Sequence, residues 1–275
     1  MKSQSELNWV FILITGTVIL IFFVSFAFKY KSLQEEKLSL EILNNLDNTL
    51  TSLKSSPYNT FDKINLPIEI QVTCNEIKLN NNNFKTNNLL FSKETLKNKM
   101  LIYYKPFKAP FKISDFYLIT DVNTRYNLVY DESTKEYVKE LIDDLPQDLK
   151  QKFTLSFKTP LLRHLENNNF KNVEVKELKD NKIKINNFQI PLNKDLAYAA
   201  IFSDNFECNF NKIKQEINKA VNVYQDKVNV VRQENCNYYS FISYLDQLRN
   251  LDFNAVINIE TLNQDLAKKS CPTLY

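Results

Sequence analysis

Glycine is almost absent from this sequence. Only one of the 275 residues is a glycine, Gly16, where average usage of about 7% would give roughly nineteen. Phosphate-binding loops, the dinucleotide turn of a Rossmann fold and the nucleophile elbow all need glycine, because their backbone must adopt strained conformations close to a ligand. The chain after Gly16 contains none, so the sequence excludes all three kinds of site.

Histidine and metal-binding cysteine spacings are also scarce. His164 is the only histidine, and the four cysteines show no Cys-x-x-Cys spacing. A Ser-His-Asp or Cys-His system would have to use His164, and a zinc site would need several cysteines gathered around it. We interpret His164 as a surface or half-buried residue, and we expect no catalytic residues, no cofactor and no metal.

Asparagine is abundant where glycine is rare. The chain has 36 asparagines, and its 35 basic residues against 32 acidic ones give a net charge of only +3. Asparagine adopts left-handed backbone conformations more readily than most residues with a side chain. We therefore expect some asparagines to occupy positions where other proteins place glycine, and we interpret the run Asn80–Asn83 as a solvated turn.

The longest apolar run covers Trp9 to Phe28 and contains no charge. A helix needs about 20 such residues to cross the hydrocarbon core of a bilayer. Trp9 stands at one end, where an indole is favoured at the membrane interface, and Lys29 and Lys31 close the other end. A buried core helix is the alternative, but a run that is polar on no face argues against it. We predict a transmembrane helix over residues 9–28 after a short N-terminal segment, residues 1–8.

The orientation of this span depends on two opposing signals. Ser25-Phe26-Ala27 also allows a cleaved secretory signal, although the apolar run is longer than a typical h-region of 7–15 residues. Lysines lie mostly after the span, which by the positive-inside rule favours a cytoplasmic C-terminal domain. The four cysteines, widely spaced and free of metal motifs, favour two structural disulfides outside the cell, with reduced buried cysteines as the alternative. We expect an anchored protein with an extracytoplasmic C-terminal domain.

The chain beyond the span reads as an α+β fold in three parts. Residues 29–56 form an amphipathic stalk helix, in which Leu43, Leu46, Leu50 and Leu53 follow the 3-4-3 spacing of a coiled-coil seam or of a helix packed on a domain. A continuous helix from Trp9 to Leu53 would be about 65 Å long. A membrane helix followed by a separate spacer is the other interpretation. Ser55-Ser56-Pro57 ends the helix.

Residues 60–192 predict a mixed α+β domain. Alternation of apolar and polar residues marks strands, and a helix with an apolar face lies among them. A hairpin turn is expected at Lys179-Asp180-Asn181. The strand segments are Pro67–Thr73, Met100–Tyr104, Phe116–Thr120, Tyr126–Tyr130, Phe153–Phe157, Val173–Val175 and Ile183–Ile185, and the helix is Glu132–Asp143.

Residues 193–275 predict a helical C-terminal subdomain, a hairpin or bundle packed on the α+β domain. Its helices run through Ile213–Val231, Tyr238–Leu248 and Ile259–Leu266. The first helix separates Cys208 from Cys236 by about 42 Å, while bridged Cα atoms lie within about 7 Å. We therefore predict the disulfides Cys236–Cys271, since the next two helices run up and down, and, by elimination, Cys74–Cys208.

One segment combines aromatic and basic residues. Tyr103 to Lys112 reads YYKPFKAPFK. Such interleaving is found where proteins contact a polyanion, a glycan or lipid headgroups. The simpler interpretation, which we favour, is a proline-punctuated connection whose aromatics are core and whose lysines are solvated.

The N-terminus resembles that of archaeal type IV pilin-like proteins. The residues that carry this resemblance are Lys2-Ser3-Gln4-Ser5-Glu6, directly followed by the apolar helix. In such precursors a prepilin peptidase cuts near the glutamine, which implies a processing site between Ser3 and Gln4. The chain departs from the pattern in one respect, because its glutamate follows two positions after Gln4 instead of four.

A second resemblance is to uncharacterised single-pass membrane proteins of small-genome archaea. It implies a surface-anchored protein and no known reaction. The residues that carry it are Gln4, Glu6, Asn8-Trp9, Lys31-Ser32-Leu33-Gln34-Glu35-Glu36-Lys37, Ala199-Ala200-Ile201-Phe202, Glu207-Cys208-Asn209 and Ser270-Cys271-Pro272.

These observations favour a non-enzymatic cell-surface protein, structural or interacting, and the resemblance at the N-terminus favours a pilin-like subunit. The expected partners are the lipid bilayer and a homo- or hetero-oligomer through the leucine seam, with no nucleic acid. A membrane-tethered ligand-binding or sensory module is the alternative. An enzyme that acts through Asp, Glu, Ser or Lys alone is the least favoured.

Overall fold

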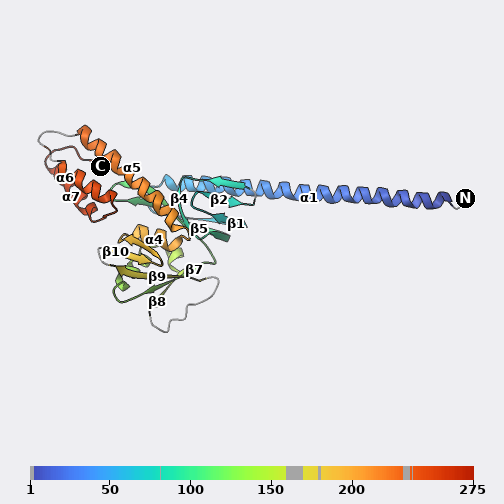
Figure 1. Cartoon of the computed structure of the whole chain (residues 1–275), viewed down its shortest axis with the longest axis horizontal. Helices are drawn as coiled ribbons and strands as arrows, with labels where there is room; N and C mark the ends of the chain where they lie inside the picture. The colour runs from blue at the N-terminus through green and yellow to red at the C-terminus, as the bar shows by residue number, and fades with distance from the viewer. Residues whose placement is uncertain (1–2, 81, 159–169, 179–180, 232–235, 237) are drawn as a thin grey trace.

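The computed structural model shows a head and a projecting helical rod (Figure 1). The rod is helix α1 (Ser3–Lys54), and the rest of the chain forms the head. The structure describes residues 3–80, 82–158, 170–178, 181–231, 236 and 238–275. Residue His164 therefore lies outside the described residues, and so do Lys179 and Asp180 of the predicted hairpin turn.

The first sheet has six strands in the order β3-β2-β1-β5-β6-β4. Its neighbours pair antiparallel except β4 and β6, which are parallel. The long pair β1–β5 extends from Thr60 opposite Tyr104 to Gln71 opposite Thr95. The strands are β1 (Thr60–Val72), β2 (Glu76–Leu79), β3 (Asn82–Lys85), β4 (Leu89–Ser92), β5 (Thr95–Lys108) and β6 (Lys112–Asp121).

The second sheet has five strands in the order β11-β10-β9-β7-β8. Strand β7 pairs parallel with both of its neighbours, and β9, β10 and β11 follow as antiparallel hairpins. Its strands are β7 (Arg125–Tyr130), β8 (Phe153–Phe157), β9 (Phe170–Leu178), β10 (Lys182–Ile185) and β11 (Phe188–Pro191).

Two hydrophobic cores lie on opposite faces of the first sheet. The smaller core joins the C-terminal part of α1 to one face. The larger core joins the other face to the second sheet and to the remaining helices. It runs without a break through Ile190 and Leu196, on both sides of the expected boundary between residues 192 and 193. The helices are α2 (Lys135–Asp143), α3 (Gln147–Lys150), α4 (Lys194–Phe202), α5 (Phe206–Val231), α6 (Tyr239–Arg249) and α7 (Ala255–Lys268).

The mixed α+β class is confirmed, and the patterned elements are found where they were predicted. Strand β8 matches its prediction, whereas β1 and β5 are longer than the segments with clear alternation. Helix α1 ends at Lys54, just before Ser55-Ser56-Pro57. The stretch from Ser3 to Lys54 is one helix, so the alternative of a separate spacer is wrong.

Asparagines hold most of the left-handed backbone positions. Within the described residues, six non-glycine residues have positive φ, and four of them are asparagines: Asn80, Asn98, Asn181 and Asn186. The expected turn at Asn80 is present, but Asn82 and Asn83 continue into the short strand β3, which corrects the interpretation of that run as a turn throughout. The other two are Leu251 and Ser270, which follow the ends of α6 and α7.

Candidate functional site: helix α1 and its seat on the head

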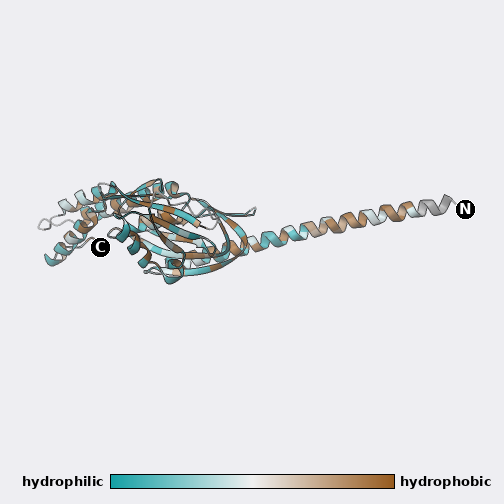
Figure 2. Ribbon diagram, turned by 90° about the horizontal axis from the view of Figure 1, so that it is seen from below, coloured by the Kyte–Doolittle hydropathy of each residue, from teal (hydrophilic) through white to brown (hydrophobic). Residues whose placement is uncertain are grey.

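The N-terminal half of α1 exposes an apolar surface all round. Every residue from 9 to 37 is exposed, including Trp9 at 69% and Phe22 at 65%. A window of this helix reaches a mean hydropathy of 2.7. Figure 2 shows this apolar stretch and, between it and the head, a hydrophilic stretch of the same helix. The helix has the length and composition to span a membrane, because about 20 apolar residues suffice.

The backbone and polar side chains of this stretch suit a hydrocarbon surrounding. Helical hydrogen bonding satisfies the backbone within the segment, which a bilayer requires. The Thr17 hydroxyl donates to the carbonyl oxygen of Leu13 at 2.8 Å. Apart from its chain neighbours and the backbone of its own helix, no atom of the described residues lies within 4 Å of a Cβ built at Gly16. The single glycine therefore does not mark a close backbone contact within the chain.

The predicted interface residues lie at the two ends of the apolar stretch. Trp9 is exposed at one end, and Lys29 and Lys31 are exposed at the other. Lys31 pairs with Glu35 one helical turn later at 3.8 Å. The predicted processing residues Ser3 and Gln4 lie in the first turn of α1, and their side chains are outside the described part of the molecule.

The C-terminal half of α1 is amphipathic and packs on the first sheet. Leu43, Leu46, Leu50 and Leu53 are exposed by 6%, 1%, 0% and 8%. They share a core with residues of β1, β5 and β6. Of the two packings that the 3-4-3 spacing allows, the molecule adopts the helix packed on a domain. The four leucines are covered by their own chain, so they present no free seam.

Polar contacts fix α1 in its position along the sheet. At the start of the packed part of α1, the Asn80 amide donates to the Ser39 hydroxyl at 3.2 Å. Farther along, the Tyr117 hydroxyl donates to the carbonyl oxygen of Leu50 at 2.9 Å, and Lys54 lies 3.9 Å from Asp115. Burial raises the pKa of Tyr117, which keeps its hydroxyl a donor. These contacts set the register of the helix on the sheet.

Disulfides join both predicted pairs of cysteines. Cys74 is bonded to Cys208, and Cys236 to Cys271, each with Cα atoms 6.0 Å apart. The first bond links the residues after β1 to the first turn of α5, and the second links the segment before α6 to the residues after α7. The disulfides thus tie the helical C-terminal part to itself and to the sheet that carries α1.

The Tyr103–Lys112 segment contains the last part of β5, the turn and the first residue of β6. Its aromatic residues Tyr103, Tyr104, Phe107 and Phe111 are all buried. Lys105 pairs with Asp195 of α4 at 3.1 Å. Burial raises the pKa of Asp195, and the neighbouring Lys105 opposes that effect. The aromatic residues therefore belong to the core, as the simpler interpretation held, although Lys105 is paired within the protein.

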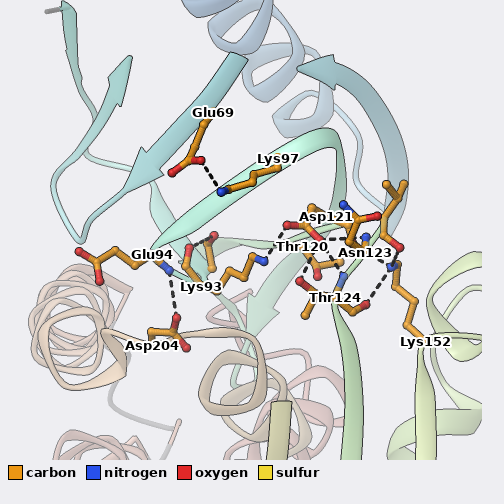
Figure 3. A network of polar contacts seen from close by, with 12 residues as sticks. Glu69, Lys93, Glu94, Lys97, Thr120, Asp121, Asn123, Thr124, Lys152 and Asp204 are labelled. Carbon is orange, nitrogen blue, oxygen red and sulfur yellow. Dashed lines mark hydrogen bonds and ion pairs between the residues drawn. The ribbon is translucent and has the colours of Figure 1, made fainter. Parts of the chain in front are cut away.

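A polar junction that the sequence analysis missed lies where the two sheets meet (Figure 3). The Asp121 carboxylate at the end of β6 accepts from the backbone and hydroxyl of Thr124 at 2.7 and 2.8 Å, and it pairs with Lys93 at 2.7 Å. Burial would raise the pKa of Asp121, but the hydrogen bonds from Lys93 and Thr124 outweigh it and leave that pKa below its usual value.

Lys152 holds the same junction from the side of the second sheet. Its ammonium group donates to the carbonyl oxygens of Asp121, Val122 and Thr124 at 2.7, 2.9 and 3.0 Å. Burial lowers the pKa of Lys152 to about 8, while the three carbonyl groups favour the charged form that supplies all three donors. No sequence signal distinguished this lysine from the many solvated ones.

Comparison with protein-family models, with curated proteins and with solved structures finds no match to this chain.

Proposed function

We propose that this chain is a single-pass membrane protein whose head lies outside the cytoplasm and serves as a structural or interaction subunit of the cell surface, of a pilin-like kind. The observation that carries this proposal is the continuity of α1. One helix presents an apolar, fully exposed half and an amphipathic half that packs on the head. A fold that kept the first half in water would expose far more contiguous apolar surface than soluble proteins do.

The disulfides support an extracytoplasmic head. Both bonds join residues far apart in the chain, with sequence separations of 134 and 35. Disulfides of this structural kind persist in oxidising compartments and are rare in the cytosol. This outweighs the modest lysine excess after the span, since the positive-inside rule is a statistical bias.

The arrangement of α1 on the first sheet supports the pilin-like character. The helix stands on one face of a largely antiparallel sheet, and its N-terminal half extends beyond the head. Together with the resemblance at Lys2–Glu6, this favours a subunit whose apolar half can reside in a bilayer before it packs against other copies. Because Leu43, Leu46, Leu50 and Leu53 are covered, we expect copies to associate through the apolar half of α1 and not through these leucines.

The first test of this proposal is the topology of the full chain in its native membrane. We expect the protein to resist carbonate extraction, and external protease to digest the head in intact cells. Ile19→Lys is the matched variant, because a charge at the middle of the span costs about 3 kcal/mol on insertion. It should reduce membrane retention and leave the head folded. A protease-resistant head in intact cells would contradict the proposal.

A non-reducing intact mass separates processing from anchoring. Four hydrogens fewer than the reduced chain would support two disulfides, and loss of residues 1–3 would support cleavage between Ser3 and Gln4. An uncut chain with both disulfides would retain the anchored surface protein and remove the pilin-like processing. A fully reduced chain would contradict the extracytoplasmic head.

The alternative, a membrane-tethered binding module, is favoured by one cavity. A cleft of about 600 Å³ lies between the β10–β11 hairpin and the α6–α7 turn, within the usual range for small-ligand sites. Ile257 and Leu192 are exposed in it by 70% and 45%. Photo-crosslinkers placed at Ile14 and at Ile257 distinguish the two functions: crosslinks between copies at Ile14 support a subunit, and crosslinks at Ile257 alone support a binding module.

A further inference from the structure

A basic hollow lies on the face of the first sheet that is turned away from α1. Its volume is about 230 Å³. Lys63 on β1 pairs in register with Leu101 on β5. Leu101 belongs to the larger core, on the side opposite α1, so the hollow opens on that side. Its polar lining residues are Lys63, Lys99, Arg125, Asp148, Gln151 and Lys152.

The charges around the hollow are unbalanced. Four of its lining residues are cations, Lys63, Lys99, Arg125 and Lys152, and one is a carboxylate, Asp148. Asp148 pairs with Lys63 at 3.1 Å, with side chains exposed by 52% and 39%. An ion pair this exposed contributes little to the stability of the fold. Lys63 can therefore leave Asp148 and bind a ligand at a small cost in free energy.

Two of the cations have no partner within the described chain. The side chains of Lys99 and Arg125 make no hydrogen bond and no ion pair with any residue that the structure describes. Arg125 is exposed and Lys99 is half-buried. The guanidinium fork of arginine matches the paired oxygens of phosphate, and lysine adds a point charge.

The frame behind the hollow is rigid. Lys152 uses its three donors on the carbonyl oxygens of Asp121, Val122 and Thr124, and Asp121 is held in turn by Thr124 and Lys93 (Figure 3). Lys152 therefore contributes charge to the hollow and no hydrogen bond. Arg125 directly follows Thr124, so this frame positions its backbone before any ligand arrives, which lowers the cost of binding.

We propose that this hollow binds a phosphate-type oxyanion, with Arg125 and Lys99 as its principal donors. Lys63 and the Gln151 amide lie at the same hollow and complete the set. Free phosphate and the phosphate of a lipid headgroup share this chemistry. The proposal does not depend on the pilin-like function, and either result for that function leaves it intact.

The position of the hollow allows both sources. Contacts of α1 with the sheet show that β6 runs back along the helix: Asp115 lies beside Lys54, and Tyr117 beside Leu50. Its end at Asp121 therefore reaches the side from which the exposed half of α1 extends. We estimate how far Asp121 lies from the apolar run, measured along the axis of α1. At 3.3 Å per strand residue and 1.5 Å per helix residue, Asp121 lies about 20 Å beyond Phe28, toward the head. A tilted span would bring it toward the headgroups.

The test is calorimetric titration of the full chain in neutral detergent with inorganic phosphate, against chloride at equal ionic strength. We expect saturable binding, weakened about tenfold or more in Arg125→Gln/Lys99→Gln, since this variant removes the charged groups of both principal donors. The control is Lys108→Gln/Lys184→Gln, which removes two charges elsewhere and should leave the affinity unchanged. Near-UV circular dichroism checks that both variants keep their fold.

The same titration in nanodiscs identifies the source. If the headgroup fills the hollow, discs rich in phosphatidic acid should weaken the apparent affinity for inorganic phosphate several-fold relative to detergent. Unchanged affinity would identify free phosphate as the ligand. Absence of saturable heat over chloride, or equal affinities in the Arg125→Gln/Lys99→Gln variant and its control, would overturn the proposal.

Discussion

The two halves of α1 share one backbone conformation and have opposite surroundings. Residues 9–37 are exposed throughout, whereas Leu46 and Leu50 in the second half are exposed by 1% and 0%. The halves differ in composition, because Trp9–Phe28 contains no charge and the second half mixes leucines with charged and polar residues. They also differ in pattern, because residues 9–28 are apolar on every face and the second half on one face. A helix that is apolar on one face can bury that face against a protein surface. A helix that is apolar on every face is typical of a buried core or of a membrane span.

Two disulfides constrain the head, and one of them joins the sheet beneath α1 to α5. Removing a disulfide is expected to have the largest effect on the free energy of unfolding. Cys74→Ser/Cys208→Ser should lower the free energy of unfolding of the head by about 5 kcal/mol, and Cys236→Ser/Cys271→Ser by about 4 kcal/mol. The order follows from the sequence separations of 134 and 35. Guanidinium unfolding followed by near-UV circular dichroism measures both. A larger loss from the shorter loop would refute this ranking.

The comparison between the halves is sharpened most directly by one pair of substitutions. Leu50→Ala should destabilise the head by about 3 kcal/mol, because it opens a cavity in a closed core. Ile14→Ala, in the half exposed by 56% at that residue, should change the stability of the head by less than about 0.5 kcal/mol. Unfolding of both variants in the same detergent gives the difference. Equal effects would mean that the apolar half also packs on the head.

A third prediction contrasts buried and exposed ion pairs in the head. Asp121→Asn should cost about 3 kcal/mol at neutral pH, because it leaves Lys93 without its buried partner. Glu69→Gln breaks the exposed pair with Lys97, whose side chains are exposed by 44% and 58%, and should cost less than about 1 kcal/mol.

The acid limb of stability tests the same residue. The folded pKa of Asp121 lies below its ordinary value of 3.8. Its contribution is therefore present above that value and is lost as the pH falls through the lower folded pKa. Asp121→Asn should flatten the fall in stability below about pH 4, as measured by urea unfolding at a series of pH values. An unchanged pH profile would show that other carboxylates account for the loss of stability at acid pH.

The smallest expected effect concerns backbone conformations that only the head contains. Within the described residues, all six positive-φ positions lie outside α1. Ser270 is exposed, with φ of 58° just after α7. Ser270→Gly should raise the free energy of unfolding by about 1 kcal/mol, since glycine carries no penalty there. Ser270→Ala is the control and should give no gain. A thermal melt in detergent resolves the two.

The sequence predicted the elements whose apolar residues form a clear pattern or run. Strand β8 was found at its predicted bounds, because Phe153 to Phe157 alternate. Helix α4 was missed as a separate element, since every residue from Leu196 to Phe202 is buried and leaves no polar face to set a period. Strands β2, β3 and β4 have four residues each, too few for an alternation to stand out among asparagines and lysines.

Some of the candidate sites could be predicted from the sequence and one could not. The apolar helix and the disulfide pairs follow from local pattern and helix length, because a long helix between Cys208 and Cys236 keeps them apart. The basic hollow could not be predicted. Lys63, Lys99 and Arg125 come from three different strands and Lys152 from the turn before β8. Each alone resembles a solvated charge. Only the pairing of β1 with β5 and the turn after β6 bring them together.

In the membrane-anchored protein that we propose, the single-helix construction of α1 also determines how forces pass between the head and the bilayer. From Thr17 to Lys54 the helix contains neither glycine nor proline, the residues at which helices bend sharply. The exposed half therefore continues rigidly from the half that packs on the first sheet, with no hinge between them. A sideways pull on the head becomes a bending moment on the span, and a change in the tilt of the span swings the whole head through the same angle.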